Sequence, residues 1–463
     1  MIISCDDELD TQYSSIYTDM KHLTSDLCKI YYEKGYRILR FNEYIIITRY
    51  LNYIPSIHRY EELSEYIKIF RKTLVNWSHE DLINLLIEID NILDGRYIAI
   101  KINCNGKNDK ASIFRDPLGL ASLYSNEKIL SDQKKLIYGL IKEDFNRIVF
   151  SVPPGIWYNF SKVDNRIWYY KALNDSMWRE NPHHIKLTSS LDKVSRLYLD
   201  YLLIRLEMIR KKEKIKNVLV AYSGGVDSSL TAKLAIESGL NVEIAIIYSK
   251  GSKDEVIYEY AYKAFPDADV KPIVFDQDQL HNDLKSIIYV VENYSPINIS
   301  VAIPEYYLFA YSGTKHVFMG QGSDELFGGY KKYVDNYEMA NELIKKDVIR
   351  SYRANFERED KLSRFFNKVL YYPLISPAIT IFALNLPLEY KILSREDHLR
   401  KWVVRYASKY LDLPDDIVLR EKRSMQYSTG SMKLLRKIAK KMNTSLTNLL
   451  YDIYSETVLK LYK

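Results

Sequence analysis

The sequence predicts an α/β protein in which a mostly parallel sheet, with helices on both faces, follows a separate strand-rich part. A strand-like run at residues 217–222 leads into a glycine turn and then into a helical pattern at 229–238. Strand-like and helical segments keep alternating up to residue 320, which is typical of a doubly wound parallel sheet. Up to about residue 175 the chain instead alternates short β-like runs with turns.

Local patterns place the individual elements. Apolar residues at helical spacing predict a helix over 191–211, and the region after residue 330 reads as helical. Residues 176–190 are polar and read as a linker, so we expect domains at 1–175 and 191–463. His183 and His184 in this linker could bind a metal, but an exposed connector explains them better. The expected strands are 218–221, 242–248, 273–275 and 317–320, and the expected helices between them are 229–238, 255–265, 279–292 and 303–313.

Bulk composition is that of a soluble globular protein. The chain has 463 residues, enough for two to three domains, with 47% hydrophobic and 27% charged residues. The net charge is a modest +6. The basic run at 210–216 could attract nucleic acid, but the solvated end of a helix explains it better, so no nucleic-acid partner is expected.

Cysteine use and hydropathy indicate a cytoplasmic protein. Its three cysteines, Cys5, Cys28 and Cys104, have neither metal-site nor disulfide-framework spacing, which fits a reducing compartment. The N-terminus is acidic and lacks a signal-peptide core. The longest apolar stretch, 375–388, is interrupted by prolines and is too short to span a bilayer, so no membrane partner is expected.

The stretch Ser-Gly-Gly-Val-Asp-Ser-Ser at 223–229 carries the strongest chemical signal. Paired glycines let backbone N–H groups approach an anion, and the serines fall where a helix N-terminus adds its positive dipole end. Asp227 can hold Mg²⁺ beside phosphates. The loop lacks the Gly-Lys-Ser/Thr of a Walker phosphate loop, and the alternative interpretation is an ordinary glycine turn.

A second glycine- and carboxylate-rich stretch, 319–330, follows the last expected strand. Since ligands of parallel sheets bind beyond the carboxyl ends of the strands, a carboxylate here could meet Asp227 and share a magnesium ion with it. The alternative is a flexible acidic loop.

Together these motifs resemble those of the glutamine-hydrolysing asparagine synthetases, members of the N-type ATP pyrophosphatase superfamily. That family pairs S-G-G-x-D-S-S with G-[EQ]-G-[AS]-D-E-L-F-G-G-Y. Residues 251–254 resemble its G-S-x-D element, and 400–403 with 413–430 resemble its archaeal branch. The resemblance covers about residues 190 to 435.

The resemblance implies an ATP-dependent amide ligase that adenylates aspartate and transfers ammonia, giving asparagine, AMP and pyrophosphate. It implies that Asp227 and Asp324 bind Mg²⁺, and that Lys422 stabilises developing negative charge. The implied catalytic residues are Lys422, Gln321 and Asp324. Gln321 stands where bacterial members of the family have Glu. The implied ATP-binding residues are Tyr222, Ile247, Met319 and Gly320 for adenosine, and Ser223, Gly224, Gly225, Asp227, Ser228 and Ser229 for the pyrophosphate.

The first 175 residues resemble the family's Ntn-hydrolase-like αββα glutaminase domain only faintly. Residues 115–124 look like R-D-x-x-G-x-x-P-L-Y. The family's catalytic thiol is a cysteine exposed by methionine removal, whereas Ile2 follows Met1 here, and Cys5 would require four residues to be trimmed. The glutamine-gripping N-G-E-[IL]-Y-N is also absent. We therefore expect a degenerate domain, with ammonia coming from solution or another protein.

Departures in the ligase half leave the acceptor open. The family's E-x-R-x-P-[FY]-L-D is replaced by residues 369–376, without its Glu, Arg and Asp. One alternative is adenylation of another carboxylate, which an amine of the same substrate then attacks to close a ring, as in β-lactam synthetases and lasso-peptide cyclases. Another is an ATP-binding pseudoenzyme or a subunit of a larger assembly. Family members are often dimers, so a homodimer is compatible with the resemblance.

Overall fold

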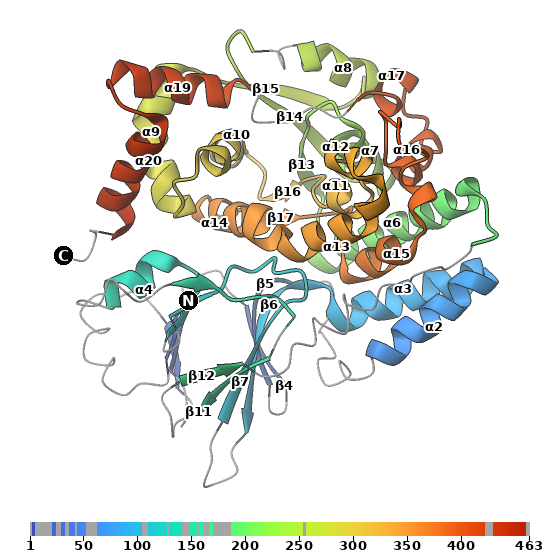
Figure 1. Ribbon diagram of the computed structural model, residues 1–463, viewed down its shortest axis with the longest axis horizontal. Helices are drawn as coiled ribbons and strands as arrows, with labels where there is room; N and C mark the ends of the chain where they lie inside the picture. The colour runs from blue at the N-terminus through green and yellow to red at the C-terminus, as the bar shows by residue number, and fades with distance from the viewer. Residues whose placement is uncertain are drawn as a thin grey trace.

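The structure is a computed structural model. It describes residues 2–4, 21–24, 29–32, 37–41, 44–51, 63–103, 110–126, 129–140, 149–155, 157–161, 166–169, 187–252, 256–421 and 429–459. Figure 1 shows a strand-rich N-terminal part below a larger α/β part, whose sheet is surrounded by helices. No helix within these ranges is long and apolar enough to cross a membrane.

A five-stranded parallel sheet forms the centre of the second part. Its order is β15 (Asp269–Phe275), β14 (Asn241–Ser249), β13 (Asn217–Ala221), β16 (His316–Phe318) and β17 (Val369–Tyr371). All four neighbouring pairs are parallel, which confirms the predicted sheet. The expectation that the chain after residue 330 is helical was wrong at β17. This three-residue apolar run is too short to show a strand pattern by itself and is extended through pairing with β16.

Helix α6 (Leu191–Glu213), predicted ahead of the sheet, and the helices predicted between its strands are present with shifted bounds. The helices between strands are α7 (Val226–Glu237), α8 (Ile257–Ala264), α9 (Gln277–Val291) and α10 (Pro296–Tyr311). The start predicted for α10 was seven residues late, because Pro296 opens the helix at its first turn and Pro304 lies inside it.

Further helices cover the sheet and complete the C-terminal part (Figure 1). They are α11 (Ser323–Leu326), α12 (Lys331–Asp335), α13 (Ala340–Ser351), α14 (Glu357–Phe365), α15 (Pro377–Asn385), α16 (Trp402–Lys409), α17 (Asp415–Val418), α19 (Ser431–Lys441) and α20 (Leu446–Tyr454). A short π-helix, Tyr352–Phe356, joins α13 to α14.

Two six-stranded antiparallel sheets make up the described N-terminal strands. Their orders are β10-β8-β9-β1-β3-β2 and β12-β11-β7-β6-β5-β4. The strands are β1 (Ile2–Ser4), β2 (Lys21–Thr24), β3 (Lys29–Tyr32), β4 (Arg37–Phe41), β5 (Tyr44–Leu51), β6 (Gly95–Asn103), β7 (Lys110–Arg115), β8 (Tyr124–Ser125), β9 (Ile129–Ser131), β10 (Phe150–Ser151), β11 (Trp157–Ser161) and β12 (Arg166–Tyr169), with helices α2 (Leu63–Asn76), α3 (His79–Leu93) and α4 (Lys134–Leu140). That they form an Ntn-hydrolase-like domain stays a prediction, as do the domain boundaries.

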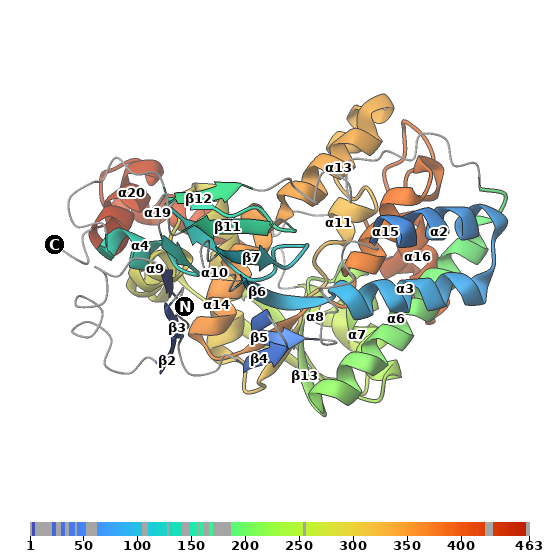
Figure 2. The ribbon, with the colours of Figure 1, turned by 90° about the horizontal axis from the view of Figure 1, so that it is seen from below.

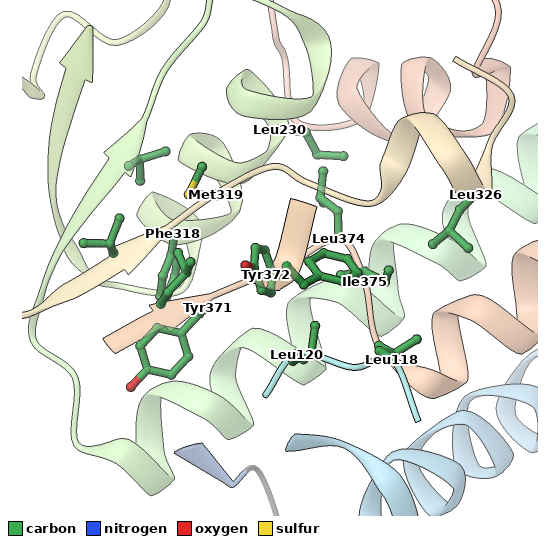
Figure 3. Close-up of a cluster of buried hydrophobic side chains, with 14 of the residues drawn as sticks. Leu118, Leu120, Leu230, Phe318, Met319, Leu326, Tyr371, Tyr372, Leu374 and Ile375 are labelled. Carbon is green, nitrogen blue, oxygen red and sulfur yellow. The ribbon is translucent and has the colours of Figure 1, made fainter. Parts of the chain in front are cut away.

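The hydrophobic core is continuous between the two parts. Leu118 and Leu120, just after β7, belong to the same cluster of buried side chains as Tyr372, Leu374 and Ile375. Figure 3 shows these leucines facing the segment that follows β17. Burying a leucine side chain stabilises a fold by roughly 1.5–3 kcal/mol, so these contacts help to hold the N-terminal part against the sheet. Helix α3 packs beside α6 and α15, as Figure 2 shows from below.

Candidate nucleotide-binding and catalytic site

The serine–glycine loop joins the carboxyl end of β13 to the first turn of α7. Gly224 has φ +68°, a conformation that favours glycine, and Gly225 caps the helix. The backbone N–H of Ser223 donates to Ser228 Oγ at 3.2 Å. The Ser229 hydroxyl donates to the Gly225 carbonyl at 3.0 Å. These bonds fold the loop tightly over the N-terminus of a twelve-residue helix, a geometry that suits an anionic ligand.

Two carboxylates from neighbouring strand ends meet at one ammonium group. Asp227 follows β13 and Asp324 follows β16, and these strands pair in the sheet. Lys401 Nζ lies 2.5 Å from Asp227 Oδ2 and 2.9 Å from Asp324 Oδ1. The Lys401 side chain is 1% exposed, and the two carboxylates are 11% and 12% exposed. The structure therefore concentrates two negative charges and one positive charge in a largely desolvated position.

The donor set fits a magnesium ion. Asp227 Oδ1 is buried and has no hydrogen-bond partner among the described residues. Mg²⁺ is usually held by one or two carboxylates, with water and substrate phosphates completing the octahedron. Among the described residues, no group of three or more His, Cys, Asp or Glu side chains could enclose a metal. Asp227 and Asp324 would therefore hold a magnesium ion together with the phosphates of a bound nucleotide.

An unusual backbone turn presents Lys401. Both Arg400 and Lys401 have positive φ, +58° and +56°, which costs about 1–3 kcal/mol for each non-glycine residue. The turn is fastened by Arg405, whose buried guanidinium donates to the carbonyls of Arg400 at 2.6 Å and Leu399 at 2.5 Å. Arg400 Nε in turn donates to the Gly329 carbonyl at 3.0 Å. A Cβ at Gly329 would overlap Asp324 Oδ1, so the glycine is required for this approach.

Behind Gln321 lies a buried acidic pair. Gln321 Nε2 donates to Glu359 Oε1 at 2.8 Å, and the Tyr372 hydroxyl donates to Glu359 Oε2 at 2.5 Å. Arg358 binds Glu305 through two hydrogen bonds of 2.7 and 2.8 Å and lies 3.3 Å from Glu359. Burial, followed by the charge of Glu305, raises the pKa of Glu359 to about 8. The two carboxylates share one arginine.

An apolar cavity opens beside these groups. Its lining combines predicted site residues with the apolar residues Ala221, Ile246, Ile257 and Pro304 and with Thr429. Burial raises the pKa of Tyr222 to about 12, so this phenol stays neutral. A pocket with mostly apolar walls and a few polar groups is typical of a small-molecule or cofactor site.

The structure brings most of the predicted site residues together. The following predicted residues line the one cavity: Tyr222, Ser223, Asp227, Ser228, Ile247, Met319, Gly320, Gln321 and Asp324. Gly224, Gly225 and Ser229 shape the loop but do not line this cavity. Lys422 lies outside the described residues.

Sequence analysis missed three residues of this site. Lys401 and Arg420 stand in stretches noted only as resembling the archaeal branch, and Glu359 was not noted at all. Arg420 Nη1 donates to the Gly224 carbonyl at 2.9 Å, so it contacts the glycine loop directly. A lysine 174 positions from Asp227 gives no spacing signal, since only the fold brings the two side chains together.

The parallel sheet, its serine–glycine loop and the paired carboxylates define an α/β protein with a candidate ligand site at the carboxyl ends of its strands. The model of the family described as Asparagine synthase matches residues 216–351 and 334–462. The chain therefore belongs to the asparagine synthase family and to the class of ATP-dependent ligases that form carbon–nitrogen bonds.

Similar proteins carry the same family name. The chain is 28% identical to "Putative asparagine synthetase (glutamine-hydrolyzing) 1" of Methanocaldococcus jannaschii, over 84% of this chain and 79% of that protein. It is 25% identical to asparagine synthetase (glutamine-hydrolyzing) 2 of Oryza sativa, over 74% of this chain and 58% of that protein, so it spans little more than half of the plant relative's length. A solved NMN synthetase from Francisella tularensis aligns with 58% of this chain and 86% of its own, at 15% identity and a TM-score of 0.30.

Proposed function

We propose that this protein uses ATP to adenylate aspartate and transfers ammonia to the adenylate, forming asparagine, AMP and pyrophosphate. The observation that carries the proposal is the meeting of Asp227 and Asp324 at Lys401. Both carboxylates stand beside the glycine loop, at the edge of the sheet where parallel-sheet proteins bind ligands. The family membership and the asparagine synthetase names of the relatives support the same reaction.

In the proposed complex, adenosine lies against Tyr222, Ile247 and Met319 in the apolar cavity, and the phosphates lie over the loop. Asp227 and Asp324 would hold Mg²⁺, which supplies positive charge that stabilises the departing pyrophosphate. An aspartate carboxylate oxygen attacks the α-phosphorus while the bond to the bridging β-phosphate oxygen breaks. Ammonia then attacks the acyl carbon, AMP leaves, and the nitrogen loses a proton.

Two side chains would act on the acyl group. Gln321 lines the cavity and is oriented by Glu359, so we assign it to binding the acceptor. Lys422 keeps its predicted role, stabilising the negative charge that develops in the tetrahedral intermediate.

We propose free ammonia, or ammonia passed from another protein, as the nitrogen source. Support comes from the sequence, which lacks the family's N-G-E-[IL]-Y-N motif for gripping glutamine. A cytoplasmic location and a homodimer remain predictions.

A second candidate is adenylation of another carboxylate, followed by attack of an amine of the same substrate on the adenylate, which closes a ring. It is favoured by the apolar sequence of β17, where the family's Glu and Arg are replaced. The buried Arg358 and Glu359 next to Gln321 supply a guanidinium and a carboxyl group in this region, although the Glu and Arg of the family motif are replaced.

The test is pyrophosphate release from ATP and Mg²⁺ with aspartate and either ammonium or glutamine, with asparagine quantified. Asparagine from ammonium but not from glutamine supports the proposal. Asparagine from glutamine would overturn the nitrogen source. Absence of aspartate-dependent pyrophosphate would overturn aspartate as the acceptor, and a screen of other carboxylates would then test the second candidate.

A further inference from the structure

Helix α14 carries two charged faces with different partners. Its residues Glu357 and Asp360 point to the N-terminal part, whereas Arg358 and Glu359 point to Glu305 and Gln321. Figure 1 shows α14 along the boundary between the two parts, directly above β5 and β6. One rigid helix therefore connects the N-terminal part to the nucleotide site.

The contacts on the N-terminal face are buried and ionic. Arg96 Nη1 of β6 lies 3.1 Å from Asp360 Oδ1, and the backbone N–H of Ser122 donates to Asp360 Oδ2 at 3.0 Å. Arg115 Nη1 lies 3.2 Å from Glu357 Oε1. The two arginines are 5% and 0% exposed, so solvent ions screen neither pair strongly.

Arg96 also reaches the other face of the helix. Its Nη2 donates to the Leu370 carbonyl of β17 at 3.4 Å, and its guanidinium carbon lies 5.8 Å from the centre of the Tyr372 ring. The Tyr372 hydroxyl donates to Glu359, which accepts the amide of Gln321. A continuous series of contacts thus runs from the N-terminal part to a side chain in the cavity.

We propose that Arg96 is a positioning residue for the ligase site, acting on Gln321 through Tyr372 and Glu359. Only the predicted effect on kcat rests on the proposed function; the predicted effect on Glu359 does not. This role of Arg96 gives the N-terminal part a function that needs no glutamine hydrolysis, because the ligase half depends on a cation from β6.

Arg96 is one of several groups that shift the pKa of Glu359. Glu305 from α10 raises the pKa of Glu359, whereas Arg358 from α14, the Tyr372 hydroxyl beyond β17 and Arg96 from β6 lower it. Removing the Arg96 charge therefore raises the pKa of Glu359. The substitution also removes the contact of Arg96 with the Tyr372 ring. Glu359, which accepts hydrogen bonds from Tyr372 and Gln321, is then held less firmly.

The experiment compares Arg96→Met and Arg96→Lys with Arg115→Met in the full-length chain. Arg115 serves as the control, since it is also buried and also binds α14, through Glu357. It is not among the main charges that shift the pKa of Glu359. For asparagine formation from ammonium, Arg96→Met should lower kcat about tenfold and move the pH profile to higher pH. Arg96→Lys should restore the position of the profile, and Arg115→Met should leave it unmoved.

A second readout does not need turnover. The protonated carboxyl band of Glu359 in the infrared spectrum, assigned by its loss in Glu359→Gln, is followed against pH. A titration at higher pH in Arg96→Met but not in Arg115→Met supports the proposal even if aspartate proves not to be the substrate. Equal titrations in both variants, or kcat losses that only follow the folded fraction, would overturn it and leave Arg96 a structural residue.

Discussion

The ammonium group of Lys401 bridges the carboxylates of Asp227 and Asp324, at 2.5 and 2.9 Å. Three residues from distant parts of the sequence thus meet in a buried position beside the glycine loop, where one ammonium group offsets part of the charge of two carboxylates. This cation between two carboxylates explains how the buried site tolerates its negative charge.

Lys401→Met should destabilise the protein, because two buried carboxylates then face each other without a cation. Breaking a buried ion pair in this way costs about 3–5 kcal/mol. Mg²⁺ should restore part of the loss by neutralising the same carboxylates. Thermal unfolding with and without Mg²⁺ measures this, and a variant that is indifferent to Mg²⁺ would contradict the metal assignment.

Asp324→Asn should lower ATP–pyrophosphate exchange by about two orders of magnitude, since losing a metal ligand removes several kcal/mol of charge stabilisation. Asp278→Asn, at an exposed position in the first turn of α9, is the control and should retain full exchange. Equal activities of the two variants would show that Asp324 does not act in the chemistry.

Gly224→Ala should weaken both folding and ATP binding. Alanine at φ +68° costs roughly 1–2 kcal/mol, and its Cβ would lie 2.5 Å from Arg420 Nη1. Gly239→Ala is a matched control, with φ +73° and open space around the added Cβ. Both variants should be destabilised by the cost of placing alanine at a positive φ. Only Gly224→Ala should raise the KM for ATP. Matching KM values would exclude a role for the loop in nucleotide binding.

Glu359→Gln should flatten the pH dependence of stability. The pKa of Glu359 is raised from 4.5 to about 8 in the folded protein, so its stabilising contribution is full below pH 4.5. That contribution is lost as pH rises toward 8, by up to a few kcal/mol. Urea unfolding between pH 5 and 8 should show a smaller decline in the variant than in the wild type. Parallel declines would contradict a raised pKa.

Apolar runs and glycine turns allowed the sheet and its loops to be predicted. Residues 217–229 encode a strand, a turn and a helix within one short stretch, and such local signals do not depend on the rest of the fold. The predicted helix at 303–313 missed the first seven residues of α10, which begins at Pro296 and contains Pro304.

The missed residues act through tertiary contacts. Lys401 is 77 positions from Asp324, and its side chain reaches the site through two consecutive residues of positive φ that no propensity predicts. Glu359 is one of several charges in a short helix, and only packing separates those that face β6 from those that face Gln321. Neither position could be recognised without the arrangement of the helices around the sheet.

The most direct test of adenylation uses aspartate labelled with ¹⁸O in its side-chain carboxylate, with ATP, Mg²⁺ and ammonium. If the carboxylate attacks the α-phosphorus and ammonia then displaces AMP, mass spectrometry will find one ¹⁸O atom in each AMP formed, together with asparagine. Unlabelled AMP, or ADP and phosphate in place of AMP and pyrophosphate, would contradict the proposed reaction.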